Sequence, residues 1–447
     1  MSKRITEATP VAFHDSLPES VDAVVIGAGV VGTSCAYFLA GSGVKVLLCE
    51  KGRVAGEQSS RNWGWIRQQG RDPAELPIMM ESNRIWRGLA EETGEGDLAF
   101  TPSGCLYLAE TDAALAKFTD WYEVAKQHQL DTRLLSADEV RGLAPHLVGD
   151  WVGGMLTPSD GRGEPFVAVP ALARAAQARG ATVIENCAVR TVEFEAGRVA
   201  GVATEHGRVR AGAVLLAGGA WSTYFAGNLG LDLPQLMVRS TVGRTKPAPE
   251  MLPYNASLPG MAFRRRADGG YTITSADLAE HFVAPRSFKY LTKYLTLLRA
   301  SAKDVKLRLG PPAGYPGAWS QPRRWGPDDV SPFEHMRVLD PTPAPEVERR
   351  VLERLPRRAP WLAEAGIEEM WAGMIDVTPD AVPYLCEVPS HPGLYLGTGM
   401  SGHGFGIGPG VGRVLADLIN GRPPGYDMSR FRFDRFSDGS PIVPGPY

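Results

Sequence analysis

The chain has 447 residues, which is too long for one simple hydrophobic core and predicts two domains. Its net charge of −3 argues against a general nucleic-acid-binding protein, and 44% hydrophobic with 22% charged residues is typical of a soluble globular protein. No apolar run reaches the ~20 residues of a membrane span, and the N-terminus lacks the apolar region of a secretory signal. The five cysteines are scattered and form no CxxC pair, which argues against structural zinc. We therefore expect a cytoplasmic protein.

Residues 21–50 predict a strand, a glycine turn, a helix and a second strand. An apolar run at 21–26 is typical of a buried parallel strand, and the turn Gly27-Ala28-Gly29-Val30-Val31-Gly32 follows it. A helical pattern and a second apolar run, 44–49, come next, and that run ends at Glu50. This order is that of a dinucleotide-binding βαβ unit.

Each glycine of the turn has a separate role in such a unit. Gly27 permits the tight turn, Gly29 lets the backbone approach a pyrophosphate, and Gly32 lets the helix pack on the strand. The helix N-terminus presents unpaired N–H groups to the phosphates, and Glu50 can accept hydrogen bonds from both ribose hydroxyls. The alternative is an ordinary βαβ unit with a glycine-rich turn.

The middle of the chain returns to alternating helices and strands. The patterns predict helices at 76–96, 111–129, 136–143 and 169–179, and strands at 182–185, 188–194, 199–204 and 213–217. Ser136 followed by Glu139 predicts a capping box at the start of its helix. The last of these strands runs into Gly218-Gly219-Ala220-Trp221, which indicates a second close approach of backbone to a ligand.

The next segments predict the parts of a second unit. The turn Ala267-Asp268-Gly269-Gly270 predicts a hairpin over 261–275 in an antiparallel sheet. Residues 287–302 predict one amphipathic helix, followed by an extended, proline-rich connection at 311–345. The helix has one apolar face, Phe288, Leu291, Leu295 and Leu298. Its basic opposite face is interpreted either as a contact surface for a membrane or partner, or as the solvated side of a helix that covers the domain.

A glycine-rich segment also lies near the end of the chain. Residues 393–406 predict a short strand and a glycine loop, and a helix is expected from about Pro409 to residue 419 because proline suits a first turn. Glycine-rich nucleotide-type elements therefore occur at the start, middle and end of the chain. The nucleotide-binding domain must be assembled from separated segments.

The dispersed motifs resemble those of the FAD-dependent amino-acid and amine oxidoreductases, such as D-amino-acid oxidase, glycine oxidase, sarcosine oxidase and D-amino-acid dehydrogenase. The resemblance is carried by the fingerprint up to Glu50, by Ala217-Gly218-Gly219-Ala220-Trp221-Ser222, Trp371-Ala372-Gly373, Thr378-Pro379-Asp380, and the 397–406 loop with its helix. The fingerprint alone also fits NAD, and the later motifs favour FAD. The resemblance implies an α/β (α+β overall) fold, with a Rossmann-like FAD-binding domain and a substrate domain that has a mixed or antiparallel sheet. We expect residues 1–85, 150–232 and 366–447 in the first domain, and 86–149 and 233–365 in the second.

The resemblance also implies which residues contact the cofactor. The 397–406 loop, called the flavin loop below, and the helix N-terminus would lie beside the flavin N1 and C2 carbonyl. There the helix dipole and the backbone N–H groups around Ser401–Phe405 would favour the reduced flavin. The segment 56–71 would run from the adenosine side toward the flavin ring. The expected FAD-binding residues are Gly27, Gly29, Gly32, Glu50, Ser59, Ser60, Arg61, Gly218, Trp221, Gly399, Ser401, Gly402, His403, Gly404 and Phe405.

FAD is expected to be bound non-covalently. Some relatives attach the flavin through a histidine in the segment that matches 56–71, which contains none here. Others use a cysteine shortly before the Thr-Pro-Asp motif, and Gly373 occupies that place.

The substrate residues depart from the family pattern. Family members often have an arginine near Trp-x-Gly that binds the substrate carboxylate, but Met374, Ile375 and Asp376 follow Gly373 here. Asp376 is interpreted as holding a substrate cation, or as a structural partner of an arginine or a turn. Arg67 is a candidate carboxylate ligand, with a salt bridge or phosphate contact as the alternative. His403 is a candidate contact to the flavin ring or substrate, with a backbone-only role as the alternative.

The resulting hypothesis is an FAD-dependent enzyme that oxidises a C–N bond of an amino acid, secondary amine or opine-like compound by hydride transfer to flavin N5. The alternatives are an FAD-dependent monooxygenase that uses NAD(P)H, and a flavin-binding subunit of a multi-subunit amine dehydrogenase. Residues 271–279 lack the lysine that some family oxidases use for oxygen, which leans toward a dehydrogenase. The expected partner is a small-molecule amine or amino acid, with a homo-oligomer or a partner subunit as open options.

Overall fold

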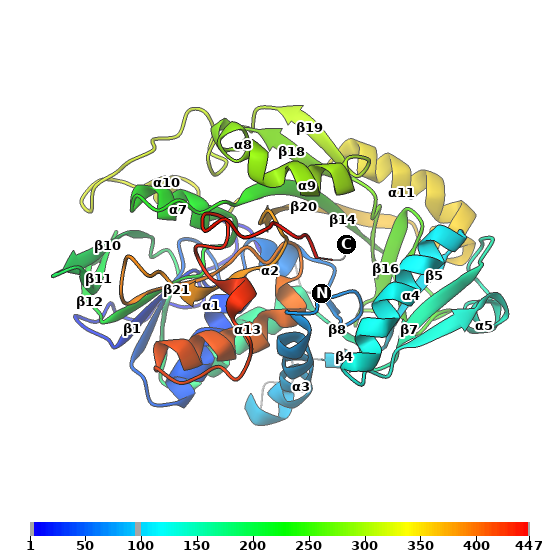
Figure 1. The fold of residues 1–447 in the computed structure, drawn as a ribbon, viewed down its shortest axis with the longest axis horizontal. Coiled ribbons are helices and arrows are strands. Elements are labelled where there is room, and N and C mark those ends of the chain that lie inside the picture. The colour runs from blue at the N-terminus through cyan, green and yellow to red at the C-terminus, as the bar shows by residue number, and fades with distance from the viewer. Residues whose placement is uncertain (1–3, 94–99, 446–447) are drawn as a thin grey trace.

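The computed structural model describes residues 4–93 and 100–445, and two sheets organise it (Figure 1). The first is a six-stranded sheet in the order β21-β22-β13-β1-β2-β9, parallel except for β21. Its strands are β1 (Ala23–Ile26), β2 (Val46–Cys49), β9 (Thr182–Ile184), β13 (Ala213–Leu216), β21 (Tyr384–Glu387) and β22 (Leu394–Thr398). Segments from the start, middle and end of the chain therefore meet in one sheet, as predicted.

Both faces of this sheet are covered, which explains why its strands are apolar throughout. Val25 packs into a core with the helices on one face, while its neighbour Val24 packs into a core on the other face. The first face carries α1 (Val30–Gly41), α3 (Leu76–Thr93), α6 (Pro165–Ala178) and α13 (Gly404–Ile419). The second carries β10 (Val189–Glu195), β11 (Arg198–Thr204), β12 (Gly207–Arg210), α7 (Ser222–Asn228) and α10 (Pro332–His335).

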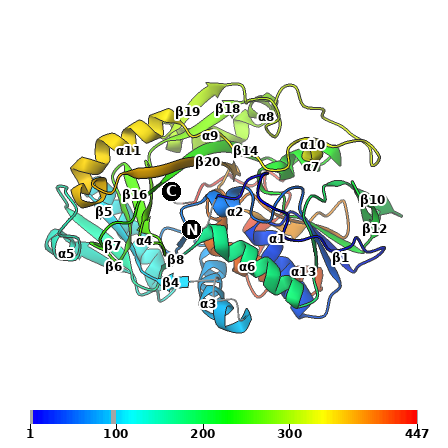
Figure 2. The ribbon, with the colours of Figure 1, turned by 180° about the vertical axis from the view of Figure 1, so that it is seen from behind.

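The second large sheet has ten strands and is mixed. Its order is β19-β18-β14-β17-β16-β15-β5-β7-β6, with β20 on the other side of β14, and most neighbours are antiparallel. Its strands are β5 (Cys105–Ala109), β6 (Arg133–Ser136), β7 (Gly153–Thr157), β14 (Leu236–Thr245), β15 (Asn255–Leu258), β16 (Met261–Arg265), β17 (Tyr271–Thr274), β18 (Ala279–Val283), β19 (Val305–Leu309) and β20 (Ile367–Val377). Helices α4 (Asp112–Gln127), α5 (Ala137–Leu143) and α11 (Pro345–Arg358) lie around it, as Figure 2 shows from behind. The predicted α/β class with a mixed or antiparallel second sheet is confirmed.

Several local predictions are confirmed. Ser136 and Glu139 form the capping box of α5, and the 261–275 hairpin pairs β16 with β17. The helix expected at 76–96 is α3, and residues 94–96 lie outside the described part of the chain. The loop expected at 56–71 contains a short helix, α2 (Gln58–Arg61), and a short strand, β3 (Trp65–Ile66). Strand β3 pairs with β8 (Gly161–Gly163), which also pairs with β4 (Phe100–Pro102).

The start of the last helix was predicted wrongly. Helix α13 begins at Gly404, so Pro409 lies inside it and not in its first turn. Proline has no N–H to donate within the helix. Side chains of α3 form hydrogen bonds with backbone groups on either side of Pro409. Ser82 Oγ and Trp86 Nε1 of α3 donate to the carbonyl of Gly406, and Ser82 Oγ also accepts from the N–H of Gly410. The helix therefore begins five residues earlier than proline alone suggests.

The prediction of a single helix at 287–302 was also wrong. The segment forms α8 (Pro285–Lys289) and α9 (Leu291–Ser301), which meet at Tyr290. Tyr290, Tyr294 and Leu297 face the protein, whereas most of the predicted apolar face is exposed. The tyrosines bury well because their hydroxyls find partners: Tyr290 Oη donates to Asp232, and Tyr294 Oη donates to the Val377 carbonyl.

Candidate active site

A cavity of about 390 Å³ lies where the six-stranded sheet, α2, β20 and the start of α13 meet. Most of the predicted site residues line it: Gly27, Gly29, Glu50, Ser59, Arg61, Arg67, Gly218, Trp221, Asp376, Ser401, Gly402, His403, Gly404 and Phe405. Gly32, Ser60 and Gly399 do not line it. The fold thus brings motifs from the two ends and the middle of the chain to one cavity.

The glycine turn is shaped by close backbone approaches. Gly27 has φ +101°, and a Cβ on it would lie 2.6 Å from the Ala217 carbonyl oxygen at the end of β13. A Cβ on Gly32 would lie 2.0 Å from the Gly27 carbonyl oxygen. Only glycine fits at both positions, so Gly32 acts by allowing the turn to form and not by lining the cavity.

Glu50 is held in place at the end of β2. Its Oε2 accepts the Ala28 N–H at 2.8 Å, and its Oε1 accepts the Gly52 N–H at 2.9 Å. Burial raises the pKa of Glu50 to about 7. The carboxyl group is therefore fixed beside the glycine turn, where a nucleotide ribose would need an acceptor.

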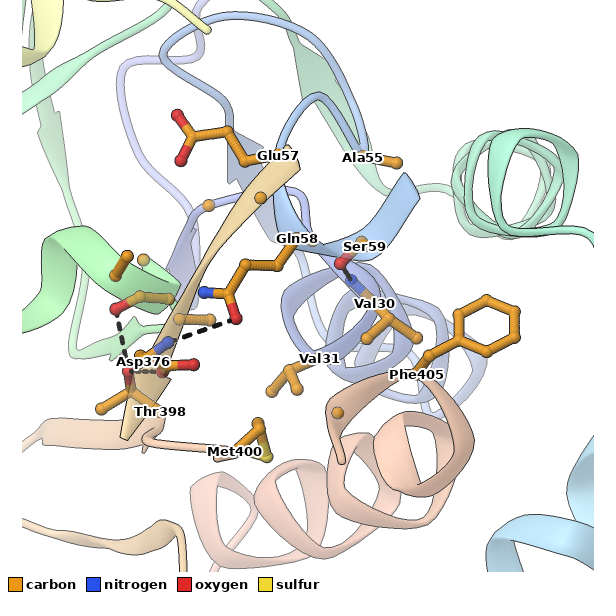
Figure 3. Close-up of a pocket in the computed structure, with 18 of the residues that line it drawn as sticks. Val30, Val31, Ala55, Glu57, Gln58, Ser59, Asp376, Thr398, Met400 and Phe405 are labelled. Atoms are coloured by element: carbon orange, nitrogen blue, oxygen red, sulfur yellow. Dashed lines mark hydrogen bonds between the residues drawn. The ribbon is translucent and has the colours of Figure 1, made fainter. Parts of the chain in front are cut away.

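The segment after β2 supports the turn through side chains. Ser59 Oγ accepts the N–H of Val30, the first residue of α1, at 2.8 Å (Figure 3). Ser60 is buried, and Arg61 donates to Asp340 at 2.5 Å and to the Gly56 carbonyl. The Arg61 guanidinium thus links the segment before α2 to the segment that contains Asp340. Arg61 also lines the cavity. Flavin contact by these residues stays a prediction.

The predicted residue Trp221 belongs to a polar group with Lys51 and Glu57, which sequence reasoning missed and which also line the cavity. Trp221 Nε1 donates to the carboxylate of Glu57 at 3.0 Å, and Lys51 Nζ donates to Glu57 at 2.6 Å. Lys51 Nζ also lies 4.5 Å from the centre of the Trp221 ring. No periodicity marks this group, because Lys51 and Glu57 lie in the irregular segment between β2 and α2, and Trp221 lies in the turn after β13.

Asp376 lies in the wall formed by β20 and is 1% exposed. Its Oδ2 accepts the Gly399 N–H at 2.7 Å. The same oxygen accepts the Thr398 hydroxyl at 3.3 Å (Figure 3). Gln58, also missed from the sequence, reaches across and accepts the Asp376 N–H at 3.4 Å. Burial raises the pKa of Asp376. Gly399 therefore does not line the cavity itself but helps to position the carboxyl group of Asp376, which does.

His403 and Glu75 form a second polar pair at the start of α13. His403 Nδ1 lies 3.6 Å from Glu75 Oε2, and neither atom has a hydrogen-bond partner in the described part of the chain. Burial, with Arg71 and Arg67 nearby, holds the pKa of His403 well below its usual value. Burial raises the pKa of Glu75 to about 8. Both groups are therefore neutral near pH 7.

Beside this pair are donors without acceptors. Arg71, which sequence reasoning missed, lines the cavity and is 3% exposed, and its Nη1 has no partner among the described residues. Burial and the neighbouring Arg67 lower the pKa of Arg71 to about 9. The indole N–H of Trp65, which also lines the cavity, lacks an acceptor within the same residues. The sequence did contain one signal for Arg71. It lies four residues after another cation, Arg67, in the 56–71 segment that the resemblance directs toward the flavin ring.

These features fit a dinucleotide cofactor. The cavity is lined by the glycine turn and Glu50, by the N-terminus of α13, and by buried donors that lack partners among the described residues. Such donors are satisfied when an anionic or carbonyl-bearing group occupies the cavity. The fold and this site together define a dinucleotide-dependent oxidoreductase of the flavin type.

The chain belongs to the FAD-dependent oxidoreductase family, whose model ("FAD dependent oxidoreductase") matches residues 22–418. The predicted family and the predicted cofactor, FAD, are thereby confirmed. The chain is 29% identical to human mitochondrial sarcosine dehydrogenase over 93% of its length, but it spans only 42% of that protein. It is 28% identical to D-amino acid dehydrogenase of Paramagnetospirillum magneticum, covering 93% of this chain and 98% of that one. The solved structure of L-amino acid deaminase from Proteus myxofaciens, in complex with anthranilate, matches with a TM-score of 0.91 at 31% identity over 97% of both chains.

Proposed function

We propose that this protein oxidises a C–N bond of an amino acid. FAD supplies the acceptor for the α-hydrogen and its electron pair, which converts the amine to an imine that water hydrolyses. One observation carries the proposal. Arg71 lines the cavity, and its buried Nη1 has no hydrogen-bond partner among the described residues. The names of the relatives, which are dehydrogenases and a deaminase of amino acids, support the same reaction class.

The carboxylate of the substrate is assigned to Arg71 and Trp65. Arg71 has no carboxylate within ion-pair distance in the described chain, and the second cation beside it, Arg67, increases its need for an anion. A buried charge without a partner is costly, and a guanidinium offers a carboxylate two parallel hydrogen bonds. The carboxylate-binding role that some relatives give to the Trp-x-Gly strand would then lie in the segment after α2. Met374 and Ile375 on β20 are therefore compatible with an amino-acid substrate.

The amino group of the substrate needs a different environment. His403 is neutral and its Nδ1 has no hydrogen-bond partner among the described residues, so it can accept a hydrogen bond from the neutral amino group of the substrate. Asp376 stays our candidate for holding a substrate cation, and Arg67 for assisting Arg71. Each of these roles is a proposal that substitution tests.

The domain assignment is part of the same proposal. We assign residues 1–85, 150–232 and 366–447 to a domain that binds FAD non-covalently, and 86–149 and 233–365 to the substrate domain. All six strands of the mainly parallel sheet come from the first set, but β7 and β20, also in that set, pair in the ten-stranded sheet. A Cβ on Gly373 would lie 3.2 Å from the Arg61 Cβ, so a flavin-tethering cysteine there would be crowded, which supports non-covalent binding.

Anaerobic titration of the purified yellow protein tests the function. D- and L-amino acids are compared with the amines that remain when their carboxylate is removed, and flavin reduction is followed by absorbance. We expect an amino acid to reduce the flavin at concentrations roughly tenfold or more below its decarboxylated amine. Equal reduction by the two would refute the carboxylate site. Reduction by NADPH and by no amine would refute C–N oxidation and favour the monooxygenase.

A further inference from the structure

Residues 285–319 expose an unusual number of large apolar side chains. Among the described residues, eleven large hydrophobic side chains are exposed, and six of them lie in this stretch. They range from 41% to 101% exposed and are Phe288, Leu291, Leu295, Leu307, Leu309 and Trp319. We call these six residues the apolar surface.

The apolar surface is formed by neighbouring elements. The rings of Phe288 and Trp319 lie 6.3 Å apart between centroids. Trp319 Nε1 donates to the Val283 carbonyl at 3.3 Å, and Val283 is paired with Leu309 across β18 and β19. Helices α8 and α9 and strands β18 and β19 lie together along one edge of the molecule in both ribbon views (Figures 1 and 2). The exposed side chains therefore gather on one edge.

The same stretch is strongly basic. Residues 285–309 contain seven lysines and arginines and one aspartate, whereas the whole chain has a net charge of −3. Three of these cations form ion pairs with carboxylates outside the stretch: Lys289 with Asp232, Lys306 with Glu346, and Arg308 with Glu280. Of the other four, Arg299 and Lys303 are exposed and have no carboxylate partner in the part of the chain that the structure describes. Arg286 donates to the Thr223 carbonyl and Lys293 to the Phe436 carbonyl. The edge thus keeps a positive charge beside its apolar side chains.

The outward orientation of the leucines is fixed. Tyr290 Oη donates to Asp232 at 2.7 Å, and Tyr294 Oη donates to the Val377 carbonyl at 2.5 Å. These tyrosines, with Leu297, occupy the inward face of α9. Leu291 and Leu295 cannot turn inward without displacing them, so the apolar surface is a permanent feature of the fold.

We propose that the apolar surface docks on an anionic lipid bilayer. Leucine, phenylalanine and tryptophan side chains enter the boundary between headgroups and acyl chains, and the lysines and arginines around them meet anionic headgroups. Within residues 4–93 and 100–445, none of the helices has the length and hydrophobicity for crossing a bilayer, so this contact is peripheral. A second copy is a poorer occupant because two cationic edges would face each other. Strand β19 also carries Lys306 and Arg308, charges typical of an edge strand that does not pair with another chain.

Co-sedimentation of the FAD-loaded protein with vesicles tests the proposal. Vesicles of phosphatidylcholine are compared with vesicles in which about one third of the lipid is phosphatidylglycerol. We expect binding to the anionic vesicles and a roughly tenfold or larger loss of it in the Leu291→Glu/Leu295→Glu variant. The matched control is Val148→Glu, because Val148 is comparably exposed but lies outside the apolar surface, after α5, where its N–H donates to the carbonyl of Arg358 at the end of α11. Flavin content and amine-dependent flavin reduction confirm that each variant is folded.

A second variant pair separates charge from apolar contact. Arg299→Glu/Lys303→Glu should weaken binding to anionic vesicles and make the remaining binding less sensitive to salt. The proposal is overturned if the wild-type protein does not bind anionic vesicles at physiological salt, or if Val148→Glu loses as much binding as the leucine variant. It is also overturned if gel filtration shows a dimer that the leucine variant abolishes, since the surface then belongs to a second copy.

Discussion

Arg71→Met removes the buried guanidinium that the proposed function depends on and keeps a side chain of similar length. A charged hydrogen bond contributes about 1.5–3 kcal/mol, and Arg71 can offer two of them to a carboxylate. The variant should therefore lose about 3–6 kcal/mol of carboxylate binding, which is a factor of roughly 10²–10⁴ in Kd. The thermal stability of the Arg71→Met variant, in contrast, should not decrease. The unpartnered Nη1 makes Arg71 a buried charge without compensation, so its removal offsets the lost Nε bond to the Arg67 carbonyl at 3.2 Å. The melting temperature of the variant should not fall.

The assay uses two ligands of nearly the same shape, one with a carboxylate and one with a neutral amide. Benzoate and benzamide are titrated against the FAD-loaded protein, and the change in flavin absorbance gives each Kd. Arg71→Met should weaken benzoate by the factor given above and leave benzamide nearly unchanged. Arg84→Met is the matched control, because Arg84 is an exposed arginine of α3 that pairs with Glu81.

Two results would refute this reasoning. A benzoate Kd that changes less than about threefold would mean that Arg71 does not meet the carboxylate. Equal weakening of benzoate and benzamide, together with a lower melting temperature, would mean that Arg71 shapes the protein and not the ligand.

Three further predictions address the other groups of the cavity. Burial raises the pKa of Glu75 to about 8, so its contribution to stability is present below about pH 4.5 and is lost as the pH rises to about 8. When the pH is raised from about 6 to about 9, the free energy of unfolding of the wild-type apoprotein should fall by about 2–3 kcal/mol more than that of Glu75→Gln. Denaturant melts measure both values, and equal losses would contradict the raised pKa of Glu75. Glu50→Gln should raise the Kd of FAD at least about tenfold in reconstitution followed by flavin fluorescence, and an unchanged Kd would contradict the ribose role. Asp376→Asn should weaken an amino-acid substrate and leave benzoate unchanged; unchanged substrate affinity would remove Asp376 from the substrate site.

The parts of the fold that the sequence predicts well are governed by local chemistry. The turn from Gly27 to Gly32 is a case, because glycine is required there by backbone contacts within one βαβ unit. The capping box of Ser136 and Glu139 is another, since both partners lie in one helical turn. Family resemblance added what local chemistry does not contain, namely that segments hundreds of residues apart share one cavity.

The errors and omissions have a common cause in tertiary contacts. Periodicity placed the leucines of 287–302 inside, but the two tyrosines go inside because Asp232 and the Val377 carbonyl accept from their hydroxyls. Arg71 was missed for a similar reason. What distinguishes it is burial without a partner, and that property depends on elements that pack around it and are remote in sequence.

The flavin loop shows how such contacts refine a family expectation. The resemblance implies flavin hydrogen bonds from the backbone N–H groups around Ser401–Phe405 and a cofactor contact by Gly399, but the Gly399 N–H is donated to Asp376. Strand β20 is antiparallel to β14 and ends at Val377, which carries Asp376 to the loop that follows β22. Ser401 and His403 also donate their N–H groups, to the carbonyls of Asp376 and Met400 at 3.0 and 2.8 Å. The loop residues whose N–H groups are left for the flavin are therefore Gly402, Gly404 and Phe405. Asp376→Asn should then disturb the loop little, because an amide oxygen can still accept from Gly399, and any change in substrate affinity reports the lost charge.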